Sequence, residues 1–146
     1  ATLGVSLDCV RRSPILSRKV TDFSIPLFAN IHLCGSVFAE TFLVCVVSQL
    51  LYGHLPDPAT MTLFIILLGI FAVGAPGVPG GTVLASLGIV TSVLGFGDSG
   101  TALLIAIFAL QDGFGTACNI TGDGALSLIT DTSAKRHVPD LEAEAL

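Results

Sequence analysis

Lysine and arginine are missing from the whole middle of this chain. All six basic residues lie near its ends, and none occurs between Lys19 and Lys135. Over the full length 52% of the residues are hydrophobic and only 12% are charged, whereas a soluble domain carries about 25% charged residues. This shortfall excludes a solvated globular enzyme, a nucleic-acid-binding domain and a disordered tail. It predicts an all-α protein embedded in the lipid bilayer.

Two apolar stretches are long enough to cross a bilayer as helices, residues 23–52 and 102–132. Polar side chains and a glycine gather at residues 30–36, inside the first stretch. We therefore expect a transmembrane helix over 23–52 that is broken mid-span, and a second transmembrane helix over 102–132.

Two shorter apolar stretches, 61–73 and 82–96, are each too short to span the bilayer comfortably. They flank the sequence GAPGVPGG at 74–81, which cannot hold a helix. Unpaired backbone inside a membrane is tolerated where it is buried in protein or lines a wet cavity. We therefore predict a re-entrant helical hairpin over 61–96 with its tip at 74–81. Two short crossings joined by an ordinary surface turn are the alternative.

The basic clusters at both ends favour the cytoplasmic side. Residues 133–146 are then a cytoplasmic tail, and the chain is a multi-pass protein of the cell membrane. Two crossings with a hairpin satisfy this rule, and so do four crossings, but helix length favours the first arrangement.

Two acids, Asp112 and Asp123, lie inside the last apolar span, and Thr116 and Asn119 fall near the same helical stripe. Carboxylates inside a membrane are costly and are by default functional hypotheses. Because no lysine or arginine lies in the span, these acids must be protonated or must hold a cation. As an alternative, protonated acids could simply hydrogen-bond neighbouring helices.

His32 lies inside the first span and could carry a proton, or it could be a hydrogen-bonded packing residue. No nucleophile–base pair, metal cluster or phosphate-binding loop stands out from the sequence, so we do not expect an enzyme.

The sequence PGVPG at 76–80, followed at the right separation by NITGD at 119–123, resembles the dicarboxylate/amino acid:cation symporters, the glutamate transporter family. The similarity runs from Ala1 to about Arg136. It implies a C-terminal portion of the transport domain, with residues 1–22 forming the second arm of a first hairpin and a cytoplasmic-side linker. The missing scaffold that holds family members as homotrimers would lie before Ala1.

The resemblance also implies a role for each matching residue. Asp112 would hold the amino group of a substrate, and Thr116 and Asn119 would contact that substrate. Asn119 and Asp123 would bind the coupling cation, sodium or a proton, and no other cofactor is implied. The hairpin tip would close over the substrate through backbone groups of Val78, Pro79 and Gly80.

Two departures from the family pattern change these expectations. The family signature Asn-Met-Asp-Gly-Thr appears here as HLCGS at 32–36, so both its asparagine and its aspartate are lost. His32, Cys34 and Ser36 are therefore candidates for a proton site or an altered cation site. Gly115 stands where acidic-substrate members carry an arginine, which favours a neutral amino acid over a dicarboxylate.

The sequence thus predicts cation-coupled symport of amino acids or dicarboxylates by alternating access. The alternative is a truncated or non-transporting membrane fragment of the same fold.

Overall fold

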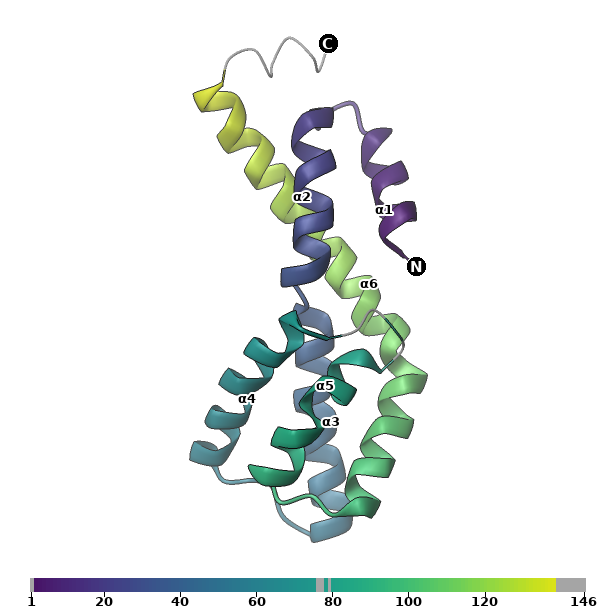
Figure 1. The fold of residues 1–146 in the computed structure, drawn as a ribbon, viewed down its shortest axis with the longest axis vertical. Helices are drawn as coiled ribbons and strands as arrows, with labels where there is room; N and C mark the ends of the chain where they lie inside the picture. Colours follow the sequence, from purple (N-terminus) through teal and green to yellow (C-terminus); the bar gives the residue numbers. More distant parts are fainter. Residues whose placement is uncertain (1, 76–77, 79, 139–146) are drawn as a thin grey trace. The chain divides into compact units, whose positions relative to one another are not determined.

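The computed structural model describes residues 2–75, 78 and 80–138, and every regular element in this part of the chain is an α-helix (Figure 1). The expected all-α class is therefore confirmed for the described residues. In chain order the helices are α1 (Thr2–Arg11), α2 (Arg18–Ile31), α3 (Cys34–Tyr52), α4 (Pro58–Val73), α5 (Gly81–Ser92) and α6 (Asp98–His137). They divide into two units, each described by itself. Unit 1 is Ala1–His32 with Asn119–Leu146, and unit 2 is Leu33–Cys118.

In unit 1, α1 and α2 pack as an antiparallel pair (Figure 1). An ion pair between Arg11 Nε and Asp22 Oδ1, at 2.7 Å, joins them. The buried side chains of this unit are largely polar. On and just before α2 they are Ser17, Thr21, Ser24 and Ile25.

Unit 2 has an apolar core to which four helices contribute. Its fully or nearly fully buried members are Leu43, Val44, Val47, Phe64, Leu68, Val83, Ile89, Val90, Phe96, Leu104 and Phe108. Within this unit α4 and α5 lie side by side as a helical hairpin (Figure 1). Residues 76, 77 and 79 of its predicted tip lie outside the described residues.

The ends of the hairpin helices follow from local chemistry. Asp57 caps α4, because its Oδ1 accepts from the amides of Ala59 and Thr60 at 3.0 and 3.1 Å, and Pro58 occupies the first helical turn, where its missing N–H costs nothing. α4 has 16 residues and α5 has 12, which correspond to roughly 24 and 18 Å. Both are shorter than a hydrocarbon core of about 30 Å. The re-entrant arrangement itself stays a prediction.

Two segments of the described chain are long and apolar enough to cross a membrane, Arg18–Tyr52 and Asp98–His137. In the most apolar 18-residue stretch of each segment, only 33% and 17%, respectively, is buried. A core helix of a soluble protein would be mostly buried. Within the first segment α2 ends at Ile31 and α3 begins at Cys34, so residues 32–33 interrupt the helix where polar residues gather in the sequence. That this interruption lies within one membrane span stays a prediction.

Candidate functional site

Helix α6 carries four of the predicted site residues, Asp112, Thr116, Asn119 and Asp123, on or beside one buried stripe. Its buried positions include Leu104, Phe108, Gly115, Asn119, Asp123, Ser127 and Asp131. Positions four apart lie on the same helix face. The stripe is apolar at 104 and 108 and polar from 119 onward, so the helix presents a core-forming face in unit 2 and a hydrogen-bonding face in unit 1.

In unit 2 the structure brings Asp112 together with the end of the hairpin tip. The Gly80 amide donates to Asp112 Oδ2 at 3.3 Å. Gly80 is the residue from which α5 starts, and its φ of 75° is left-handed, a conformation that glycine adopts at little cost. The amino end of a helix carries partial positive charge, so a carboxylate is well placed beside it.

A second helix amino end reaches α6 one turn further along. The first turn of α3 lies against Gly115, where an added Cβ would be 3.4 Å from Ser36 Cα and 3.5 Å from Gly35 C. These are ordinary van der Waals distances. Unit 2 therefore aims the amino ends of two helices at the same stretch of α6, which also carries the half-buried Thr116.

The other predicted residues of unit 2 differ in exposure. Ser36 is buried, whereas Cys34 and Val78 are exposed. Pro79 lies outside the described residues.

In unit 1 the structure pairs His32 with Asp123. His32 Nδ1 lies 2.9 Å from Asp123 Oδ1, and the side chains are 25% and 5% exposed. The two atoms share one hydrogen bond, whose donor is Nδ1 when the carboxyl is ionised, because an ionised carboxylate only accepts. The sequence analysis places Asp123 in the cation site and His32 in a separate candidate proton or altered cation site. In the structure the two side chains are direct partners. Asn119, one turn earlier on α6, is also buried.

The His32–Asp123 contact is one of a series of polar contacts that follow α6 in steps of four residues. Ser24 Oγ donates to Ser127 Oγ at 2.8 Å. One turn later, the Ser17 amide donates to Asp131 Oδ1 at 3.1 Å. We call this series the polar ladder; its members on α6 are Asp123, Ser127 and Asp131, and their partners are His32, Ser24 and Ser17.

Sequence reasoning missed a buried polar pair in unit 2. Glu40 of α3 is fully buried, and Ser86 Oγ of α5 donates to its Oε1. Glu40 Oε2 has no hydrogen-bond partner within the described part of the chain. An acid in an apolar stretch is a visible signal for Glu40, but nothing in the sequence points to Ser86 as its partner.

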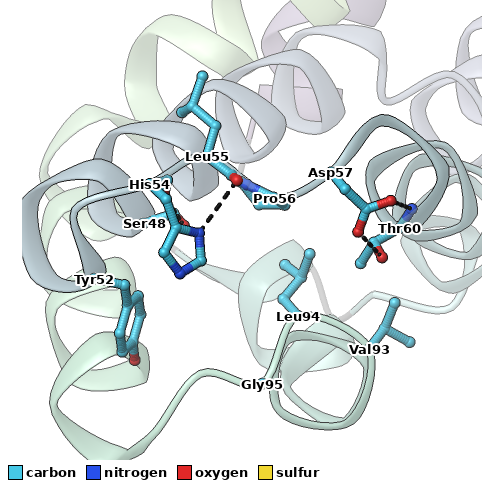
Figure 2. Close-up of a pocket in the computed structure, with 10 residues that line it drawn as sticks. All are labelled: Ser48, Tyr52, His54, Leu55, Pro56, Asp57, Thr60, Val93, Leu94 and Gly95. Atoms are coloured by element: carbon cyan, nitrogen blue, oxygen red, sulfur yellow. Dashed lines mark hydrogen bonds between the residues drawn. The ribbon is translucent and has the colours of Figure 1, made fainter.

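A cavity of about 420 Å³ lies in unit 2 between the α3–α4 connection and the end of α5 (Figure 2). Tyr52, His54, Asp57 and Leu94 are among its lining residues. It contains none of the predicted site residues.

The comparison with protein families decides the identity of the chain. The model of the sodium:dicarboxylate symporter family matches residues 1–133. The chain belongs to this family. The resemblance seen in the sequence is thereby confirmed. The family is one of transporters and not of enzymes, and this symporter-family chain is a membrane protein.

Curated relatives agree over nearly all of the chain. Excitatory amino acid transporter 3 from Oryctolagus cuniculus is 26% identical over 145 residues, which are 99% of this chain and 27% of the relative. The Homo sapiens protein of the same name is 27% identical over the same shares. An excitatory amino acid transporter from Caenorhabditis elegans is 27% identical over 123 residues, 84% of this chain and 24% of the relative. The chain thus spans about a quarter of the length of these relatives. No solved structure matches it significantly.

Proposed function

We propose that this chain is the C-terminal part of a secondary active transporter, which carries amino acids or dicarboxylates in symport with a cation by alternating access. The observation that carries the proposal is the family match over residues 1–133. The excitatory amino acid transporters among the relatives support an amino-acid substrate.

Asp112 is proposed to hold the amino group of the substrate. The proposal is supported by its position: its carboxylate is half-buried in an apolar helix and meets the amide at the start of α5. A substrate ammonium would supply the positive charge that the surrounding sequence lacks. The amino ends of α3 and α5 beside it offer backbone N–H groups and partial positive charge to the substrate carboxylate.

The hairpin formed by α4 and α5 is proposed to be re-entrant and to act as the gate. Backbone groups of Val78, Pro79 and Gly80 would then close over the substrate, with Thr116 and Asn119 contacting it from α6. The contact between Gly80 and Asp112 supports this assignment, because it places one end of the tip beside the proposed ammonium partner.

A neutral amino acid is the proposed substrate class. Gly115 offers no side chain to a second carboxylate, whereas an arginine there would bind one through two parallel hydrogen bonds. The coupling cation, sodium or a proton, is proposed to act through Asn119 and Asp123, with His32, Cys34 and Ser36 as an altered cation or proton site. The complete protein is proposed to be a multi-pass homotrimer of the cell membrane.

Uptake by the full-length protein in proteoliposomes tests the proposal. Labelled neutral amino acids should accumulate against their gradient, and accumulation should stop when the sodium and proton gradients are both dissipated. Uptake that is indifferent to both gradients would reject coupled transport.

A non-transporting membrane protein of the same fold is the second candidate. The replacement of the signature asparagine and aspartate by His32 and Cys34 favours it. Stabilisation by an amino acid in a thermal-shift assay, without any uptake in proteoliposomes, would support this candidate over a transporter.

A further inference from the structure

The family resemblance implies a coupling cation, sodium or a proton, at Asp123, and the residues around this carboxylate do not fit sodium. Its Oδ1 already forms a hydrogen bond with His32 Nδ1 at 2.9 Å. Sodium is a hard cation that is held by oxygen atoms, whereas an imidazole nitrogen suits transition metals. Among the described residues no group of three His, Cys, Asp or Glu gathers around a common point.

The imidazole fills the space beside the carboxylate. At Gly122, the residue directly before Asp123, an added Cβ would collide with His32 Cε1 and would lie 3.1 Å from Nδ1 and 3.2 Å from Nε2. The ring therefore lies against the backbone of α6, and the missing side chain of Gly122 makes room for it. An ion that approached Asp123 from this side would have to displace the ring.

The pairing belongs to a wider pattern of satisfied polar groups. In the polar ladder, Ser127 and Asp131 also have their partners on or just before α2. Asp131 in addition pairs with Lys135 at 2.7 Å. No lysine or arginine lies between Lys19 and Lys135, and His32 is a described hydrogen-bond partner of this nearly fully buried carboxyl, so burial does not leave the carboxyl unpaired.

We propose that His32 takes the place of a sodium ion at Asp123, so that this carboxylate does not bind sodium in this protein. This proposal rests on the proposed function and deepens it. If the protein is a symporter, its transport cycle would lack the sodium ion that Asp123 would otherwise bind. The test of this proposal measures sodium binding and not uptake. Its outcome is therefore independent of whether the protein transports amino acids.

The experiment measures the melting temperature of the full-length protein in detergent, in sodium chloride and in choline chloride at equal ionic strength. A ligand that binds only the native state stabilises it. Asp123→Asn is the key variant, because its amide oxygen still accepts from His32 while the charge that sodium needs is gone. We expect the wild type and D123N to show the same difference between the two salts.

The second arm of the experiment uses a variant in which the asparagine and the aspartate of the family signature are restored. The H32N/C34D variant should gain a saturable, sodium-specific rise in melting temperature that the wild type lacks, and adding D123N should abolish that gain. His54→Asn is the matched control, since His54 is exposed in a loop and its ring hydrogen-bonds the neighbouring Leu55 carbonyl, far along the chain from Asp123. It should change nothing.

Two results would overturn the proposal. One is a sodium response of the wild type that disappears in D123N. The other is an H32N/C34D variant that is folded in choline chloride and still gains no sodium response, because His32 would then not be what excludes the ion. An absence of uptake in proteoliposomes would count against the proposed function and leave this result standing.

Discussion

The imidazole of His32 and the backbone of Gly122 are in such close contact that position 122 has no room for a side chain. Gly122→Ala should therefore push the ring away from Asp123 and break the 2.9 Å hydrogen bond. Leaving a buried carboxylate without this partner should cost about 1–3 kcal/mol of unfolding free energy. Chemical or thermal unfolding of the protein in detergent measures it.

Gly124→Ala is the matched control, because an added Cβ at Gly124 meets nothing within 4 Å. It should be neutral or stabilising by up to about 1 kcal/mol, since alanine favours a helix over glycine. In an H32A background the penalty of G122A should vanish. A penalty that persists there would show that the ring is not the obstacle.

Asp112→Asn should weaken amino-acid binding. A hydrogen bond to a charged group contributes about 1.5–3 kcal/mol, so the apparent affinity should fall roughly 10- to 100-fold. Concentration-dependent uptake or thermal shift measures the change. Asp98→Asn, an exposed acid in the first turn of the same helix, should leave affinity unchanged; equal effects of both variants would remove the role assigned to Asp112.

Gly115→Arg should shift selectivity toward substrates with a second carboxylate. The position accepts a Cβ at ordinary contact distance from Ser36, and an arginine can bind a carboxylate through two hydrogen bonds. Competition uptake should show a gain for acidic over neutral amino acids of about tenfold. Gly113→Arg, at an exposed position with open space around it, should not change the preference.

Ser86→Ala should destabilise the protein, because it removes the hydrogen-bond donor to Glu40 Oε1 while Oε2 already has no described partner. The expected loss is about 1–3 kcal/mol. Ser92→Ala on the same helix removes an exposed hydroxyl that donates to the Gly88 carbonyl, and should stay within about 0.5 kcal/mol of the wild type. A double variant with Glu40→Gln, which keeps an acceptor, should not repair the loss.

Asp57 should give the start of α4 a dependence on pH. Hydrogen bonds from the Thr60 hydroxyl, then from the Thr60 and Ala59 amides, lower the pKa of Asp57 below its ordinary value of 3.8. Because the folded-state pKa is the lower one, the stabilisation is fully present above the ordinary value and is lost as the pH falls through the lowered value. Asp57→Asn still caps the helix but does not titrate, so its melting temperature should fall less steeply in acid. Parallel slopes for both proteins would contradict the assignment.

The sequence predicts the helices better than their ends. The apolar stretch 61–73 lies within α4, but the helix begins at Pro58 because Asp57 caps it. The stretch 102–132 lies within α6, which extends from Asp98 to His137. The ends of α6 are stabilised through the helix dipole by an acid in the first turn and by Lys135 and Arg136 in the last turn. A search for apolar residues does not detect these polar ends, so it predicts too short a helix.

The partners across helices could not be predicted. Helical periodicity places Asn119 and Asp123 on one face of α6, but it does not say which helix lies opposite. The pairing of Asp123 with His32, and of Glu40 with Ser86, depends on how the helices dock. For the same reason Gly122, which belongs to a family motif, gives no sign in the sequence that it accommodates a histidine ring.

The exposed apolar side chains of α3 and α6 have a consequence for the making of the protein. Leu110 is 87% exposed, Phe114 78% and Phe38 75%, so the chain leaves these groups to lipid or to other parts of the protein. During synthesis they promote insertion of the nascent chain, and a lysine at one of these sites would oppose insertion by about 2.5–3.5 kcal/mol. Selection against misinserted chains can therefore keep basic residues out of this stretch even at positions that touch neither substrate nor ion.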